Sequence, residues 1–239
     1  MKKIVITFAL LFVLNLGYSQ AWGKNSKIKL TGTIKTETRT TSNYNEIEIG
    51  GAFQVTLVKG TEGKIIITAD ETILEKLITK CSSNRLEIKM ENGSNYSAKI
   101  EISIPVEDIS RFSYAGSGNV KSELTVESSN FEVEFSGSGK VNLPVTCQNL
   151  KVEKTGSGGL TLSGMSNNFD LKCIGSGSAN TKELKTQNTD VSQIGSGDVS
   201  VYATESINAT LTGSGNINYY GKPAKVIKKS NGSGSISAK

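Results

Sequence analysis

The chain has 239 residues, and its 27 basic and 22 acidic side chains give a net charge of +5. Charges of both signs are interspersed, which excludes the basic footprint of a nucleic-acid-binding protein. The chain has no histidine, which excludes Ser-His-Asp catalysis and histidine-based zinc sites.

Residues 1–19 predict a secretory signal peptide. Lys2 and Lys3 make the start basic, an apolar run continues to Leu16, and small residues follow at Gly17 and Ser19. Charged, apolar and small residues in this order are typical of a signal peptide, and the run is too short to span a membrane. We therefore expect an exported protein without a membrane span, in the periplasm, at the cell surface or outside the cell.

The segment that follows predicts short strands at irregular spacing. Residues 20–39 indicate a leader with a strand at 27–36, and residues 37–45 a polar connector. Alternation of apolar and polar residues predicts further strands at 46–49, 52–59, 64–69, 85–91 and 98–104. Residues 40–110 therefore read as a strand-rich N-terminal part.

One helix is predicted over residues 70–80. Ile73, Leu74, Leu77 and Ile78 recur at helical spacing there. Either Asp70 or Thr72 can be the N-cap, and Thr72 with Glu75 would form a capping box. An open end of stacked strands exposes unpaired edges, so we expect this helix to cap the coils that follow.

From residue 116 onward, a Gly-Ser-Gly triplet recurs seven times at intervals of 18–21 residues. A constant period near 20 residues is typical of a solenoid. Counted from the first glycine of a triplet, even offsets are mostly apolar and odd offsets are mostly polar, which is the alternation of a strand with one buried face. Each coil therefore predicts a strand, a Gly-Ser-Gly corner, a second strand and a variable turn.

Glycine suits such a corner because it tolerates positive φ and a backbone close by. The predicted structural corners are Gly116, Gly118, Gly137, Gly139, Gly156, Gly158, Gly175, Gly177, Gly195, Gly197, Gly213, Gly215, Gly232 and Gly234. The serines between them would form a row of hydroxyl groups, which leaves a functional interpretation of the triplet open. In the last coil, Lys228 and Ser230 occupy columns that are apolar in most other coils and predict a polar cap.

Three stretches, NYNEIEI at 43–49, FQVTL at 53–57 and ITADE at 67–71, precede these corners. Together with the signal peptide and the corners, they resemble the head GIN domain family of auto-transporter adhesin heads, exported proteins typical of Bacteroidetes. The resemblance covers residues 40–239 and implies a right-handed β-helix-like solenoid with an exported or surface role. We therefore predict an all-β solenoid of about seven Gly-Ser-Gly coils at 111–239, in one domain with a strand-rich part at 40–110 that carries one short capping helix.

We interpret the protein as a non-catalytic exported module, adhesin-like, with a glycan or protein ligand at the cell surface. The alternatives are an envelope structural protein without a ligand and a polysaccharide-active enzyme. For the enzyme, Asp170 and Asp190 stand five residues before their glycines and should be neighbours on an outer column. The lysines nearby, such as Lys151, indicate a solvated face instead.

Tyr202 and Tyr220 should point outward from adjacent coils and could stack against a sugar ring. The candidate binding face therefore consists of Asp170, Asp190, Tyr202 and Tyr220. We expect no cofactor and no metal, since Asp198 is the only aspartate that directly follows a Gly-Ser-Gly triplet.

Three cysteines, Cys81, Cys147 and Cys173, leave at least one unpaired. Their offsets from the nearest triplets differ, so stacking does not predict a bridge, and we expect buried thiols.

Overall fold

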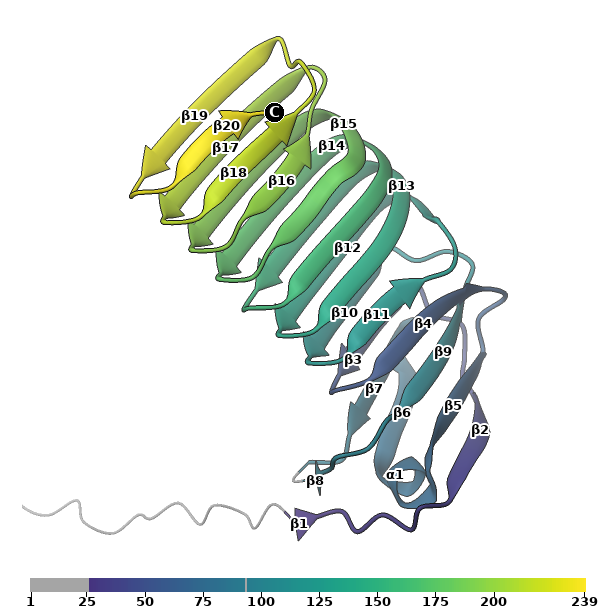
Figure 1. Ribbon diagram of the computed structural model, residues 1–239. Helices are drawn as coiled ribbons and strands as arrows, with labels where there is room; N and C mark the ends of the chain where they lie inside the picture. Colours follow the sequence, from purple (N-terminus) through teal and green to yellow (C-terminus); the bar gives the residue numbers. More distant parts are fainter. Residues whose placement is uncertain (1–25, 93) are drawn as a thin grey trace, which may run out of the picture.

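The computed structural model describes residues 26–92 and 94–239, so the predicted signal peptide lies outside the described residues. The protein is a β-solenoid whose coils stack in sequence order toward the C-terminal end (Figure 1). One 18-stranded sheet forms the stack, and it is folded into two faces because three strands bend and run through both. The predicted all-β solenoid is confirmed.

The first face begins at the N-terminal end of the stack and follows the strands that precede each corner. In spatial order these are β6 (Leu77–Ser82), β7 (Arg85–Met90), β3 (Glu46–Gly50), β10 (Arg111–Gly116), β12 (Val126–Gly137), β13 (Lys140–Thr155), β14 (Gly159–Gly175), β15 (Ala179–Gly195), β17 (Ser206–Gly213) and β19 (Lys225–Asn231). Residues near the C-terminal ends of β12 to β15 belong to this face.

The second face contains the strands that follow each corner. In spatial order these are β2 (Ile34–Thr40), β5 (Lys64–Asp70), β9 (Glu101–Val106), β4 (Gln54–Lys59), β11 (Asn119–Ser122), the first parts of β13, β14 and β15, then β16 (Val199–Tyr202), β18 (Asn216–Tyr220) and β20 (Ser235–Ala238). A separate pair, β1 (Ser26–Lys27) with β8 (Ser94–Asn95), lies at the N-terminal end.

The core lies between the two faces and is built from aligned columns of inward side chains. Phe112 is the register partner of Val133, which is in turn the partner of Val152, and all three are fully buried. Each such side chain contributes about 1.5–3 kcal/mol when it leaves water. The period-two alternation seen in the sequence therefore supplies much of the stabilising free energy of the inner coils.

The corners stack backbone on backbone. Gly175 adopts φ +116°, a conformation that L side chains rarely take, and a Cβ on Gly177 would lie 2.1 Å from the carbonyl oxygen of Gly158 in the preceding coil. At all fourteen corner glycines a Cβ would come within 2.7 Å of a backbone oxygen of a neighbouring coil. The triplet is thus required by how closely one coil lies on the next.

The N-terminal part adds coils that are not in sequence order. β3 and β4 form a coil around Gly50 and Gly51, and β10 and β11 stack on it in parallel register. The later strands β7 and β9 stack on its other side. The chain therefore starts with β2 at the edge of the N-terminal end and enters the stack at β3 and β4. It returns to that end through β5 and β6, comes back through β7 and β9, and then passes beyond β3 and β4 to begin the regular coils.

Helix α1 (Glu71–Lys76) lies at this N-terminal end, with Ile73 and Leu74 buried. The predicted helix over 70–80 is too long, because residues from Leu77 onward pair with β7 as an antiparallel strand. Asp70 is the N-cap, and its carboxylate accepts from Thr72 N, so the capping box with Glu75 is wrong. Among the described residues, none of the helical segments has the length and apolar character needed to cross a bilayer.

The predicted polar connector over 37–45 is also wrong, because β2 continues to Thr40 along β5. Most side chains of β2 are exposed, so the strand shows no alternation in its sequence. The edge strands of the N-terminal end, β2 and β6, both pair antiparallel with their neighbours, whereas the strands of the regular coils pair in parallel.

Asp70 joins this cap to the segment before it. One carboxylate oxygen accepts from Thr72 Oγ1 at 2.6 Å and Thr72 N at 3.0 Å, and the other accepts from Gly32 N at 2.7 Å. These hydrogen bonds, that of the Thr72 hydroxyl above all, lower the pKa of Asp70 to about 2.

Because the pKa of Asp70 is lower in the folded protein, its ionised form stabilises the fold above about pH 4, and this contribution disappears as the pH falls toward 2. We expect Asp70→Ala to lower the melting temperature at pH 7 and to flatten its acid dependence over that window. Asp108→Ala, at an exposed loop position, is the control and should leave both unchanged. Parallel melting curves of the Asp70 variant and the wild type across the window would contradict this role.

Candidate functional site

A shallow groove of about 650 Å³ crosses the outer side of the first face over β12, β13, β14 and β15. Phe131, Leu150 and Phe169 form its floor and are only 2% exposed. Two outward columns border it, one of asparagines and one of charged residues. The members of both columns recur once per coil, so amide groups repeat about every 4.8 Å along the groove, whereas the charge of the second column changes sign along it.

The first column, here called the amide row, consists of Asn130, Asn149, Asn168 and Asn188. Asn149 Nδ2 donates to Asn130 Oδ1 at 2.8 Å, and Asn168 Nδ2 donates to Asn149 Oδ1 at 2.8 Å. Asn188 Nδ2 continues the series to Asn168 Oδ1 at 3.2 Å. The amides of Asn149 and Asn168 are therefore each held in a fixed orientation by neighbouring amides in the coils before and after them.

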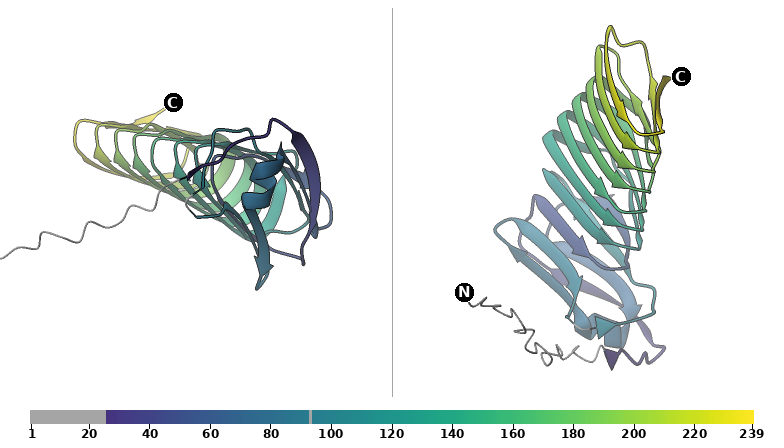
Figure 2. Two further views of the ribbon diagram at one scale, coloured as in Figure 1. Left: turned by 90° about the horizontal axis from the view of Figure 1, so that it is seen from below. Right: turned by 90° about the vertical axis from the view of Figure 1, so that its left-hand side faces the viewer.

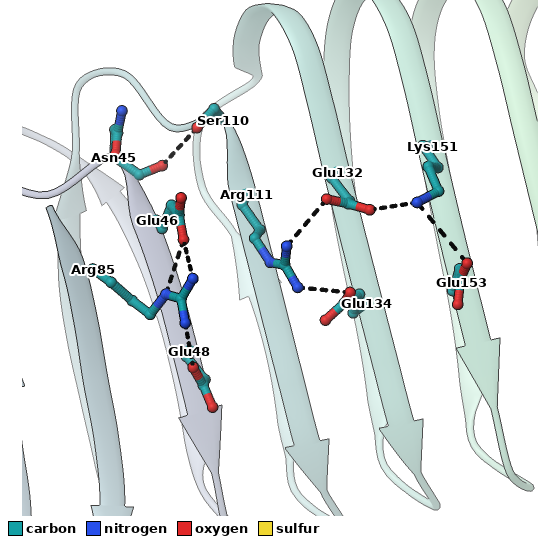
Figure 3. A network of polar contacts seen from close by, with 10 residues as sticks. All are labelled: Asn45, Glu46, Glu48, Arg85, Ser110, Arg111, Glu132, Glu134, Lys151 and Glu153. Carbon is teal, nitrogen blue, oxygen red and sulfur yellow. Dashed lines mark hydrogen bonds and ion pairs between the residues drawn. The ribbon is translucent and has the colours of Figure 1, made fainter. Parts of the chain in front are cut away.

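The second column, here called the charged column, consists of Arg111, Glu132, Lys151, Asp170 and Asp190 (Figure 3 shows its first three members). Lys151 Nζ lies 2.7 Å from Glu132 Oε1, and Arg111 Nη1 lies 3.3 Å from Glu132 Oε2. The hydrogen bond from Lys151 is the main cause that lowers the pKa of Glu132. This end of the column is neutralised within the protein.

The other end of the charged column carries two carboxylates on adjacent strands. Asp170 and Asp190 are register partners, as the sequence predicts. Partial loss of hydration, followed by the nearby Asp190 charge, raises the pKa of Asp170 above its ordinary value. Asp190 accepts a hydrogen bond from Asn208 Nδ2 at 2.7 Å. We expected lysines to neutralise the carboxylates of this face. Lys151 does so for Glu132, whereas no lysine forms an ion pair with Asp170 among the described residues.

The structure does not bring the four predicted binding residues together. Asp170 and Asp190 line the groove on the first face, whereas Tyr202 and Tyr220 are register partners on the second face. Both tyrosines are half-buried, and Lys185 Nζ lies 3.8 Å from the centroid of the Tyr202 ring. This lysine covers one side of the Tyr202 ring. Because the aspartates and the tyrosines lie on different faces, the two pairs form separate surfaces.

The amide row is the part of the groove that sequence reasoning missed. The Asn168 stretch reads as ordinary turn chemistry when it is taken alone. The signal was its position, since an asparagine stands seven residues before the first glycine of four consecutive triplets. Those residues lie within continuous strands, so the variable turn predicted for each coil is a bend in β13, β14 and β15.

The remaining candidates lie apart from the groove. Asp198 Oδ1 accepts from Asn216 N at 3.0 Å and from Asn216 Nδ2 at 2.9 Å. In the part of the chain that the structure describes, no three His, Cys, Asp or Glu side chains gather as a metal site. Cys147 and Cys173 are buried and unpaired, while Cys81, also unpaired, is only half-buried.

Over residues 43–223 the sequence matches the family described as "Putative auto-transporter adhesin, head GIN domain". The chain belongs to the head GIN domain family. This match spans the N-terminal coils, the groove and the first six Gly-Ser-Gly corners, so the resemblance seen in the sequence is confirmed.

Solved structures show the same fold as this GIN domain. A "putative adhesin" from Bacteroides fragilis NCTC 9343 is 26% identical, with a TM-score of 0.83 over 89% of this chain and 100% of that chain. A "putative lipid binding protein" from Parabacteroides distasonis ATCC 8503 is 23% identical, with a TM-score of 0.73 over 90% of this chain and all of the other. A "putative adhesin" from Parabacteroides merdae ATCC 43184 is 20% identical, with a TM-score of 0.63 over 89% of this chain and 99% of that one. A comparison with curated proteins found no match.

Proposed function

We propose that this GIN domain, residues 40–239, is an exported, non-catalytic binding module of the adhesin type, and that a glycan chain lies along its groove. The amide row carries the proposal. Each inner amide uses one N–H and one oxygen lone pair within the row, which leaves its second N–H and second lone pair for a ligand. Sugar hydroxyls both donate and accept, so they match such amides.

The shape and charge of the groove support a polymer over a single small molecule. The groove is shallow and spans several coils, and its aromatic floor is buried, so contact would be made by hydrogen bonds. Asp170 and Asp190 add carboxylate acceptors at one end. The adhesin descriptions of the family and of the Bacteroides fragilis structure agree with a binding role.

The test is a glycan array probed with the chain from residue 21 onward, followed by matched double variants. We expect Asn149→Ala with Asn168→Ala to weaken binding about tenfold or more, because two sets of ligand hydrogen bonds are lost. Asn142→Ala with Asn180→Ala removes the same groups from exposed positions on the second face and should leave binding unchanged. Equal loss in both variants, or no glycan bound by the wild type, would contradict the proposal.

Location separates an adhesin from an envelope structural protein without a ligand. An adhesin must be accessible from outside the cell, so intact cells should lose it to added protease. Full protection in intact cells, together with release on osmotic shock, would favour the structural alternative.

The polysaccharide-active alternative is tested by Asp170→Asn with Asp190→Asn. A general acid needs a carboxyl with a raised pKa in a site shielded from water, and Asp170 has the raised pKa but remains exposed. We expect no glycan cleavage by either protein and no loss of stability in the variant. Because the pKa of Asp170 is raised on folding, the wild type should lose stability as the pH rises through that pKa, and the variant should lose less. Glycan cleavage by the wild type that the variant lacks would overturn the non-catalytic assignment.

A further inference from the structure

The two ends of the solenoid differ in charge. Residues 26–205 carry 19 basic and 22 acidic side chains. Beyond Glu205 there are five lysines and no aspartate or glutamate. β17 to β20 form the C-terminal end of the stack (Figure 2). This end is therefore a positively charged tip on an otherwise slightly acidic body.

This basic tip also presents two unpaired strand edges. β19 pairs with β17, and β20 pairs with β18, and in residues 26–92 and 94–239 neither has a partner on its outer side. All seven residues of β19 are exposed, and Val226 and Ile227 keep 41% and 39% of their surfaces accessible. A strand edge in this state offers a row of free N–H and C=O groups to an additional strand.

Lys228 partly covers the interior between these edges. It occupies an inward column, and its Nζ donates to Ile236 O at 3.3 Å and lies 4.7 Å from the centroid of the Tyr219 ring. This side chain connects the two faces across the end of the core. Val226, the register partner of the buried Ile207, still keeps 41% of its surface accessible, so the pair of edges and part of the apolar interior remain open at the tip.

We propose that the outer edge of β19 is a docking site for an extended acidic segment of a partner protein, which adds to the sheet as one more strand. Lysines on an edge strand prevent pairing with a second copy, because two such edges would bring like charges together. The same lysines attract a strand that carries carboxylates. Charge complementarity and free backbone groups thus favour an acidic peptide over another copy of this chain.

The outward side chains of β19 define the sequence that fits. Lys225, Ile227 and Lys229 occupy successive outward columns. On a paired strand the directly opposed side chains lie about 4.5–5.5 Å apart. The fitting segment therefore has an acidic residue, an apolar residue and an acidic residue at alternate positions, a pattern that is the same in both strand directions.

A labelled seven-residue peptide with the central order glutamate, valine, valine, threonine, glutamate tests the proposal by fluorescence anisotropy. We expect saturable binding that weakens as salt is added. Lys225→Glu with Lys229→Glu should weaken it about tenfold or more, since two attractions become repulsions. Lys59→Glu with Lys140→Glu makes the same change of charge at exposed positions away from the tip and should have little effect.

A second peptide distinguishes strand addition from attraction to any anion. It has the same side chains and charge, but every backbone nitrogen is methylated, so neither of its edges can donate hydrogen bonds to β19 in either strand direction. We expect its binding to be at least tenfold weaker. Equal binding of both peptides, or binding of phosphatidylglycerol vesicles but not of the unmodified peptide, would assign the tip to polyanions in general and overturn the proposal. No binding of the unmodified peptide, or no effect of the Lys225 and Lys229 changes, would also overturn it.

Discussion

Replacing Gly177 by alanine should lower the free energy of unfolding by about 1–3 kcal/mol. The added Cβ would lie 2.1 Å from Gly158 O and 2.6 Å from Ser157 C, both backbone atoms of the preceding coil. Neither atom can move aside without disturbing the corner on which it stacks. Chemical denaturation of the intact chain measures this loss.

Two further glycines make the experiment specific. A Cβ on Gly159 would meet nothing closer than Lys140 Cγ at 3.9 Å, so Gly159→Ala should leave stability unchanged or raise it by about 0.4–1 kcal/mol. Gly234 lies in the last coil, and its Cβ would come 1.9 Å from Gly215 O. Nothing in the described residues stacks on the outer side of that coil, so the coil can shift, and Gly234→Ala should destabilise less than Gly177→Ala. Equal losses at Gly159 and Gly177 would contradict the close stacking of corners.

The regular coils could be predicted because every coil repeats one physical requirement. A buried column needs an apolar side chain at a fixed offset, as at Val133 and Val152, and a corner needs glycine where backbones meet. Seven repetitions make that pattern visible without any structural information. The strand-rich part repeats nothing, so each of its elements had to be read from a single short segment.

The wrong predictions of secondary structure in the N-terminal part have physical causes. Leu77 suits both a helical face and an alternating strand, and only its pairing with Met90 in β7 decides between them. The β2 strand is held by pairing with β5 while its side chains stay exposed, so its sequence carries no apolar pattern. The order of the coils could not be predicted, because it depends on long-range strand pairing. No local sequence pattern indicates that the chain passes from β9 beyond β3 to β10.

The groove was predictable in part. The offset from the triplet placed Asp170 beside Asp190, and the structure agrees. It also placed Tyr202 and Tyr220 on adjacent coils, but the offset alone did not show that they lie on a different face from the aspartates. The concave shape over Phe131 and Phe169 depends on how the strands bend, which no spacing in the sequence reports.

Lys154 is a charged residue that the register of the coils places in the core. It stands two residues before its Gly-Ser-Gly triplet, in an inward column between Phe135 and Cys173, and it is 1% exposed. Its Nζ donates to Gly156 O at 3.3 Å and lies 5.9 Å from the centroid of the Phe135 ring. Burial lowers the pKa of Lys154, against a smaller opposing influence of Cys173. The fold therefore bears the free-energy penalty of an amine held in its core without an acidic partner among the described residues.

We expect Lys154→Met to stabilise the protein at pH 7 by about 1–3 kcal/mol, because methionine keeps the length of the side chain and removes the buried amine. The folded protein releases the Lys154 proton at a lower pH than the unfolded chain, whose lysine pKa is near 10.5. Stability of the wild type should therefore rise as the pH increases through the folded pKa toward 10.5, and the advantage of the variant should shrink over the same range. Lys172→Met, an exposed lysine of the next coil, is the control and should show neither effect. A Lys154→Met protein less stable than the wild type at pH 7 would mean that the hydrogen bond to Gly156 and the contact with Phe135 outweigh the loss of hydration, and that the amine holds the corner in place.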